Sequence, residues 1–218
     1  MKITRKITTN RDQFGDKRSL SAIKFIVIHD TANDSRGADA DAHYRNLQRP
    51  NSRVGSAHYY VDDHEIVQAI DDSVVAWSVG DKWARKNRTR ADVTNYNSVN
   101  VELCINEGID KAKAYQNLIW LTRYLMQKYR AIVVRHFDAT GKPCPKSWQA
   151  NNWSQWWRFR KELMNVPSKW AEKDWNWAVD NYITDGSNPQ GQCTREQVVS
   201  LLKRMYDLIK REVQNEQN

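Results

Sequence analysis

Short apolar runs rich in β-branched residues recur along the first 165 residues, and stretches of helical periodicity separate them. The clearest runs cover residues 23–28, 99–105 and 131–134, and turn-forming residues bound them. Segments 37–48 and 113–129 instead repeat apolar residues at helical spacing, the second with Leu118, Leu121 and Leu125 on one face. A further helix at about 152–164 is expected to bury Trp153, Trp156, Trp157, Leu163 and Met164. Residues 1–20 show no clear period and are expected to form a surface lead-in. Strands that alternate with helices predict an α/β fold, with a mixed central sheet flanked by helices.

The last fifty residues predict a separate, small α-helical domain. Residues 166–168 form the one plausible linker, which divides the chain into domains at 1–165 and 166–218. A capping box at 194–197 starts a helix whose apolar stripe consists of Val198, Leu202, Met205, Tyr206 and Ile209. Two helices bury little apolar surface by themselves. We therefore expect this part to dock on the first domain or to form a homo-oligomer through its Trp-rich faces.

The positive charge of the chain lies wholly in the first domain. The formal net charge is +8, from 34 Lys and Arg against 26 Asp and Glu, and residues 166–218 hold seven of the former and eight of the latter. Such a field favours a polyanion, which could be nucleic acid, a membrane surface or an anionic wall polymer, or it serves solubility alone. Composition does not choose among these alternatives.

Membrane insertion and secretion are not expected. No stretch approaches the apolar length of a membrane span, and no apolar segment follows the basic N-terminus, so we predict no signal peptide. The three cysteines are an odd number without a framework spacing, which predicts a protein that accumulates in a reducing cytoplasm.

Two histidines and a cysteine are placed to meet at the rim of the predicted sheet. His29 ends the run 23–28, His136 ends the run 131–134, and Cys144 follows in a loop restrained by Gly and Pro. Three such ligands with an open fourth position suit a catalytic zinc ion. Two alternatives stay open. The histidines could be hydrogen-bonded strand ends beside an inert thiol, or Asp138 could complete an iron site with the two histidines.

Glu102 lies in the middle of the run 99–105. Strand alternation turns its side chain away from the face of Val101 and Leu103. The carboxylate then lies either on a solvated face or in a cleft.

Five colinear blocks resemble the zinc-dependent N-acetylmuramoyl-L-alanine amidases of phage endolysins and bacterial autolysins. The blocks are IHDTA at 28–32, SAHYYV at 56–61, AWSVGD at 76–81, VEL at 101–103 and RHFDATGKPCP at 135–145. The resemblance covers about residues 20–165. It implies the fold shared with peptidoglycan recognition proteins and cleavage of the bond between N-acetylmuramic acid and L-alanine.

The same resemblance assigns roles to individual residues. His29, His136 and Cys144 would hold one catalytic Zn²⁺. Glu102 would take the proton of the zinc-bound water and return it to the leaving amine, and Lys142 would stabilise the oxyanion. Independently of the resemblance, we expect Asp138 to hold the loop or to accept a hydrogen bond from a ligand imidazole.

The substrate cleft is predicted to depart from the family pattern at two places. Trp77-Ser78-Val79-Gly80 stands where many amidases have Trp-His-Ala-Gly, and Ala57 stands where some relatives have a tyrosine beside the metal. We assign substrate binding to Trp77, Asp30 and His58, although His58 also suits a core position. His43 and His64 are expected at the surface, and the basic loop 81–96 receives no role.

The C-terminal part resembles an S-layer-homology-type wall-binding repeat in a single copy. The pattern is Trp170-Ala171, Trp177-Ala178-Val179, Ile183-Thr184-Asp185-Gly186 and Thr194-Arg195-Glu196. Expected partners are peptidoglycan and an anionic wall polymer. Nucleic acid is not expected, because the aromatic residues beyond 150 sit at core spacing on helices.

Three functions remain in competition. They are a phage endolysin, a bacterial autolysin, and a peptidoglycan-binding module without catalysis. Cys144 favours an enzyme, since non-catalytic relatives lose the thiolate ligand. The missing signal peptide favours a phage endolysin that stays in the host cytoplasm until a separate pore-forming protein releases it to the wall.

Overall fold

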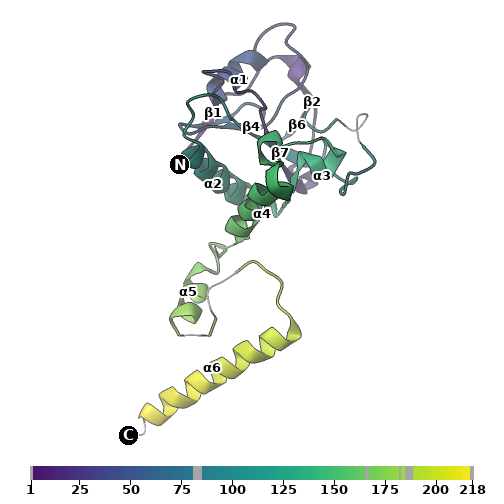
Figure 1. Ribbon diagram of the computed structural model, residues 1–218. Helices are drawn as coiled ribbons and strands as arrows, with labels where there is room; N and C mark the ends of the chain where they lie inside the picture. The colour runs from purple at the N-terminus through teal and green to yellow at the C-terminus, as the bar shows by residue number, and fades with distance from the viewer. Residues whose placement is uncertain (1, 81–84, 165–166, 182, 185–188, 217–218) are drawn as a thin grey trace. The chain divides into compact units, whose positions relative to one another are not determined.

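The protein forms two compact units, Met1–Trp156 and Trp157–Asn218 (Figure 1). The computed structural model describes residues 2–80, 85–164, 167–181, 183–184 and 189–216. The boundary between the units falls inside helix α4 (Ala150–Met164). The functional division of the chain after residue 165 stays a prediction, and part of the predicted linker lies outside the described residues.

A mixed six-stranded sheet forms the centre of the first unit. Its strand order is β1-β5-β4-β7-β3-β8, and β4 and β5 are its one antiparallel pair. The strands are β1 (Ile3–Arg5), β3 (Phe25–Asp30), β4 (Tyr59–Val61), β5 (Ile66–Gln68), β7 (Ser98–Leu103) and β8 (Ile132–Arg135). A second sheet pairs β2 (Phe14–Lys17) with β6 (Val74–Ala76). The predicted α/β class is confirmed.

The first twenty residues form two strands that the sequence does not predict. They show no defensible periodicity and were expected to be a surface lead-in, but they contribute β1 to the edge of the main sheet and β2 to the small one. Both strands are only three or four residues long. Segments that short do not reveal a period, and pairing with β5 and β6 decides their conformation.

The central strands are apolar because both of their faces are covered. All six residues of β3 are buried, as expected for a strand with parallel neighbours on both sides. Adjacent Tyr59 and Tyr60 of β4 point to opposite faces. Tyr60 packs in a cluster with residues of α1 (Ala40–Leu47), whereas the Tyr59 hydroxyl donates to Asp72, which also accepts from Tyr129.

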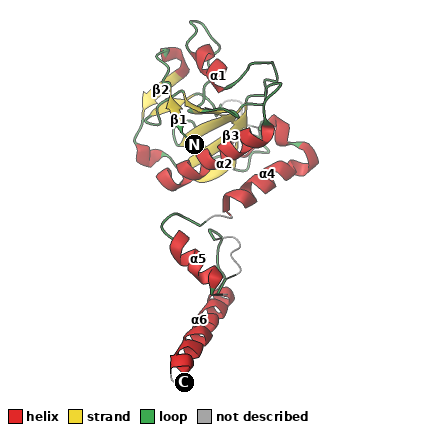
Figure 2. Ribbon diagram, turned by 90° about the vertical axis from the view of Figure 1, so that its left-hand side faces the viewer, coloured by secondary structure: helices red, strands yellow, loops and turns green. Residues whose placement is uncertain are grey.

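Helices α1 and α2 (Lys111–Tyr129) therefore cover opposite faces of the sheet, and Figure 2 shows α2 running across the strands. Asp110 caps α2 by accepting from the backbone N–H groups of Ala112 at 3.0 Å and Lys113 at 3.1 Å. The predicted apolar positions Leu118, Leu121 and Leu125 are fully buried.

Helix α4 was predicted to bury five large side chains, and it does so only in part. Trp156 and Leu163 are buried, but Trp157 is 51% exposed, so its predicted burial is wrong. The reason lies at the start of the helix. Residues 151–153 have positive φ angles between 51° and 63°, and such a left-handed turn shifts which residues face inward relative to a regular helix.

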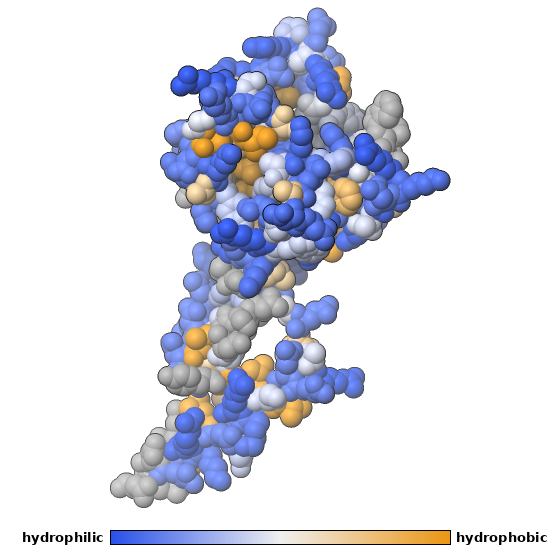
Figure 3. Space-filling view, in the orientation of Figure 1, coloured by the Kyte–Doolittle hydropathy of each residue, from blue (hydrophilic) through white to orange (hydrophobic). Residues whose placement is uncertain are grey.

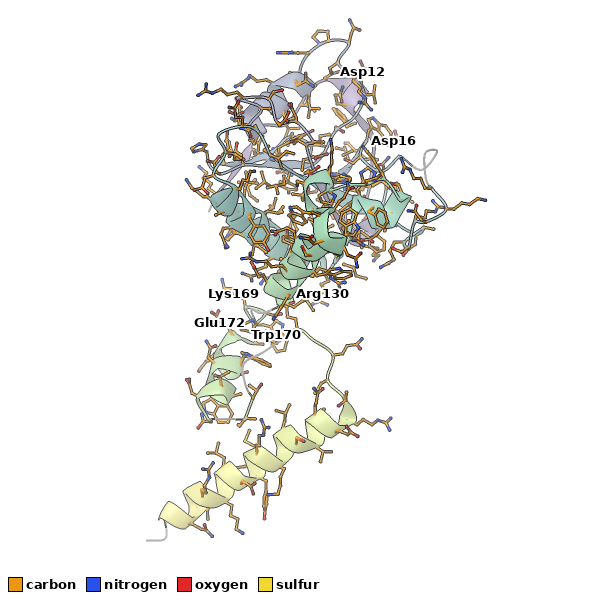
Figure 4. All side chains as sticks on the ribbon, in the orientation of Figure 1. Asp12, Asp16, Arg130, Lys169, Trp170 and Glu172 are labelled. Atoms are coloured by element: carbon orange, nitrogen blue, oxygen red, sulfur yellow. The ribbon has the colours of Figure 1, made fainter. Side chains whose placement is uncertain are left out.

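The second unit contains α5 (Glu172–Asp180) and α6 (Arg195–Glu216). Its predicted capping box is confirmed: Thr194 N donates to Gln197 Oε1 at 2.8 Å, and Gln197 N donates to Thr194 Oγ1 at 3.2 Å. Apolar side chains lie at the surface of this unit (Figure 3), including Leu202 at 64% exposure and Trp170 at 86% (Figure 4).

Docking or self-association of this unit stays a prediction, as does its likeness to a wall-binding repeat. Residues 185 and 186 of that pattern lie outside the described residues. Among the parts of the chain that are described, no helix has the length and hydropathy needed to cross a membrane. All three cysteines are free, and Cys193 is exposed.

Candidate metal centre and cleft

Strand register places four chemically active side chains in one row across the sheet. Tyr60 of β4 pairs with Glu102 of β7, and Glu102 pairs with His29 of β3. On the other side of β3, Ile28 pairs with Arg135, and His136 follows at the start of helix α3 (His136–Thr140). The row exists because these strands are parallel, so their carboxyl ends meet at one edge.

His29, His136 and Cys144 come together as predicted. Their potential ligand atoms all lie within 4.8 Å of one another, and all three residues are buried. Cys144 Sγ is 3.8 Å from His29 Nδ1, and the two imidazole centroids are 4.5 Å apart at 56°. Two nitrogen donors and one sulfur donor thus face a common point.

Backbone hydrogen bonds hold Cys144 in this position. Phe137 N donates to Cys144 O at 3.0 Å, and Gly141 N donates to Phe137 O at 2.7 Å. Gly141 has a φ of 73°, which a residue without a side chain adopts at little cost. Ser147 N donates to Asp30 Oδ2 at 2.6 Å, which ties the cysteine loop to the end of β3.

Asn100 orients the first histidine, and sequence reasoning missed it. Its Oδ1 lies 3.0 Å from His29 Nε2, and both residues are buried. A proton on Nε2 then donates to the amide and leaves the lone pair of Nδ1 facing Cys144. The available signal was an asparagine inside a buried strand, two residues before Glu102 and hence on the same face.

The donor set suits a zinc ion. His136 Nδ1 and Glu102 Oε2 are buried and have no hydrogen-bond partner among the described residues. Buried polar atoms are nearly always satisfied, so orphaned atoms beside a His-His-Cys group indicate a missing partner. Mixed nitrogen and sulfur ligation with an open position is typical of catalytic zinc.

Burial sets the protonation of the site. It lowers the pKa of His29 to about 4 and that of His136 to about 2, and the proximity of His29 and Lys142 contributes to the lower pKa of His136. Both imidazoles are therefore neutral and able to act as ligands at neutral pH. Burial, reinforced by Asp30, raises the pKa of Glu102 to about 8, although Lys142 opposes the rise. Burial also raises the pKa of the Cys144 thiol.

Asp138 fixes the conformation of the segment around His136 through its hydrogen bonds. Its Oδ2 accepts from Arg135 N at 2.8 Å, its Oδ1 accepts from Arg135 Nη2 at 2.6 Å, and Thr89 Oγ1 donates to Oδ1 at 3.3 Å. It therefore holds the loop rather than accepting from a ligand imidazole. The geometry does not support the alternative iron site with Asp138 as a ligand. Cys144 lies with the two histidines, and the Asp138 carboxylate is paired with Arg135 instead.

A cleft of about 1090 Å³ opens over the ligands. Of the predicted site residues, Asp30, Trp77, Glu102 and Lys142 line it together with the three ligands. The Trp77 indole lies against Gly15 of β2, where an added Cβ would be 2.6 Å from the ring. Ser56 Oγ accepts from Trp77 N at 3.0 Å and keeps this wall in place.

His58 does not line the cleft. It is fully buried, where its Nδ1 accepts from Asn100 N at 3.1 Å and its Nε2 lies 2.8 Å from Arg18 Nη2. The structure thus places His58 in the core, as a support for the strand that carries Asn100, and gives no surface through which it could contact substrate.

Two aromatic residues of the cleft were overlooked. His43 was expected at the surface, but it is half-buried, lines the cleft and stacks on Tyr60 with ring planes 3° apart, so that expectation is wrong. Ala57 stands where some relatives have a tyrosine, but Tyr60 lines the cleft and supplies a phenol from another position. The Tyr60 hydroxyl accepts a hydrogen bond from Ala57 N at 3.3 Å. His64 is exposed, as expected.

Comparison with known proteins agrees with this geometry. Residues 19–147 match the family model described as N-acetylmuramoyl-L-alanine amidase. The amidase XlyA of Bacillus subtilis is 38% identical over 125 residues, which cover 56% of this chain and 39% of XlyA. The amidase CwlL of Bacillus licheniformis is 29% identical over 200 residues, 85% of this chain and 53% of CwlL.

The fold matches as well. The catalytic domain of XlyA superposes with a TM-score of 0.62 at 29% identity, covering 75% of this chain and 99% of that domain. The chain spans about half the length, or less, of the curated relatives named above. The matched segment contains all three candidate ligands and Glu102 and exceeds half of the chain. The chain belongs to the N-acetylmuramoyl-L-alanine amidase family.

Proposed function

We propose that the protein hydrolyses the amide bond between N-acetylmuramic acid and L-alanine in peptidoglycan, using one zinc ion held by His29, His136 and Cys144. The observation that carries the proposal is the convergence of these three ligand atoms within 4.8 Å, at the bottom of a cleft that also contains Glu102. When bound, the zinc ion would supply Lewis acidity to water and to the scissile carbonyl.

Glu102 serves as the general base and then as the general acid. Its Oε1 is 4.0 Å from His29 Nδ1, its side chain is 21% exposed, and its Oε2 is free to accept a proton. Burial raises the pKa of Glu102 above the usual range of a carboxylic acid and towards neutrality, which a group that accepts and then returns a proton requires. Glu102 takes a proton from the attacking water and delivers it to the nitrogen of L-alanine as the amide bond breaks.

Lys142 stabilises the negative charge that forms on the carbonyl oxygen. It lines the same cleft as the candidate ligands, two residues before Cys144, and its charge lowers the pKa of both His29 and His136. A fixed cation at the developing oxyanion stabilises the transition state more than the substrate. Trp77 and Asp30, on the cleft walls, contact the substrate.

The whole protein acts as a phage endolysin in this proposal. The predicted domain 166–218 attaches the enzyme to the cell wall, and the positive first domain is attracted to anionic wall polymers. Release to the wall depends on a separate pore in the host membrane.

A wall-digestion assay tests the activity. Purified cell walls are incubated with the protein, with and without a zinc chelator, and both new L-alanine amino termini and new reducing sugar ends are measured. Amino termini that appear only without chelator support an amidase. Reducing ends, or cleavage that a chelator does not affect, would contradict it.

A further inference from the structure

The basic segment 85–90 is attached to the helix that carries His136. Arg85 N donates to Thr140 O at 2.7 Å, and the backbone N–H groups of Thr89 and Arg90 both donate to Asp138 O, at 3.0 and 2.8 Å. Thr89 Oγ1 adds a bond to the Asp138 carboxylate. This segment is therefore held against helix α3 by main-chain bonds, and its first residue, Arg85, lines the cleft.

Close packing at Gly141 supports the same conclusion. A Cβ at this position would lie 2.2 Å from Asn87 Oδ1 and 2.9 Å from Arg85 Cβ. The segment thus sits directly against the turn that leads to Cys144. The main-chain bonds and this close packing together fix the backbone and Cβ of Arg85 beside that turn.

Positively charged residues outnumber acidic ones in the lining of the cleft. Among its lining residues, Arg53, Arg85, Lys142 and Lys146 are cations, whereas Asp30 and Glu102 are the acids. Within the described part of the chain, neither Arg85 nor Lys142 forms an ion pair. An arginine without an acidic partner in a substrate cleft is available to a planar anion, which it binds with two parallel hydrogen bonds.

The substrate offers such an anion on one side only. Around the bond that the proposed activity cleaves, the sugars are neutral and the lactyl carboxyl is consumed in the amide, so nearby negative charge belongs to the peptide. The residue after L-alanine bears an α-carboxyl group, which is a carboxylate in some walls and a carboxamide in others.

We propose that Arg85 binds this carboxylate and that the enzyme therefore prefers stem peptides whose second residue is not amidated. The inference rests on the proposed amidase activity. It gives the segment 85–90 the role of holding Arg85 at the cleft, and it makes Arg85 a substrate-binding residue distinct from Lys142, which acts on the carbonyl oxygen.

The test compares two peptidoglycans that have been stripped of anionic polymers and differ only in this group, one with the free α-carboxylate and one amidated. Release of L-alanine amino termini gives kcat/KM for wild type, Arg85→Gln and Arg88→Gln. Arg88 lies on the same segment, is exposed and does not line the cleft. The two variants thus have equal net charge, and both keep the backbone bonds that seat the segment.

We expect wild type to prefer the carboxylate form by about three- to tenfold, the range for an exposed but two-pronged charge-assisted contact. Arg85→Gln should abolish the preference by slowing the carboxylate form alone, and Arg88→Gln should preserve it. Equal rates on the two walls, or equal effects of the two variants, overturn the proposal. Wild type and Arg85→Gln are also compared on an unstripped wall. An effect of Arg85→Gln confined to that wall overturns the proposal as well, since Arg85 would then bind the phosphate polymers. No cleavage of either wall would instead refute the amidase activity itself.

Discussion

Asn100→Ala should weaken zinc binding without touching a ligand. The substitution removes the oxygen that lies 3.0 Å from His29 Nε2, together with the bond from Asn100 Nδ2 to Ser98 Oγ at 3.2 Å. All three residues are buried, so water cannot replace the lost acceptor. The imidazole of His29 then loses the contact that sets its tautomer and ring orientation.

Two magnitudes follow from that geometry. Leaving a buried N–H unsatisfied costs about 1–3 kcal/mol of folding stability, which lowers the Tm by roughly 2–12 °C at this chain length. Loss of the partner of a ligand histidine typically lowers metal affinity about 10- to 100-fold, equivalent to about 1.4–2.7 kcal/mol.

A matched control separates the two effects. Asn117→Ala also removes a buried amide, whose Nδ2 donates to Asp62 O at 2.7 Å, on helix α2 and outside the cleft. Zinc affinity is measured by competition with a chromophoric chelator, and Tm by calorimetry. Both variants should lose stability, but only Asn100→Ala should lose zinc affinity. If the two variants bind zinc equally well, the reasoning about His29 is refuted.

Three further substitutions test the site. Glu102→Gln should keep bound zinc but lower kcat by about 10²- to 10⁴-fold; wall lysis at an undiminished rate would remove Glu102 from the mechanism. Cys144→Ser should lose both zinc, measured by elemental analysis, and activity, and a fully loaded variant would contradict its role as a ligand. Gly15→Ala should displace the Trp77 indole and raise KM several-fold. Gly55→Ala should leave KM unchanged, because the nearest atom to an added Cβ is 4.0 Å away. Equal KM values for the two variants would show that Trp77 does not contact substrate.

The positions of the ligands were predictable because local signals coincided. Apolar runs ended at His29 and His136, and glycine and prolines shaped the loop of Cys144. Such signals place residues at strand ends and in tight turns, and parallel strands then bring their ends together. Glu102 was left between a solvated face and a cleft, because strand alternation defines two faces without saying what covers each one.

The remaining members of the site depend on contacts between distant segments. Asn100 became a partner of His29 through the β3–β7 register, and Tyr60 reached the cleft through the β4–β7 register. His43 was expected at the surface because its local sequence does not show that α1 packs over the sheet and brings His43 onto Tyr60. The same cause explains β1 and β2, since short strands form where a partner strand supplies their hydrogen bonds.

The sequence by itself determined the α/β class, the three ligands and the family, because residue type and local spacing encode those properties. Tertiary structure alone decided which carboxylate faces the candidate metal ligands, which amide orients His29, and that Arg85 of the basic segment 85–90 lines the cleft. These depend on strand register and on backbone bonds between segments some fifty residues apart, which no local pattern in the chain specifies.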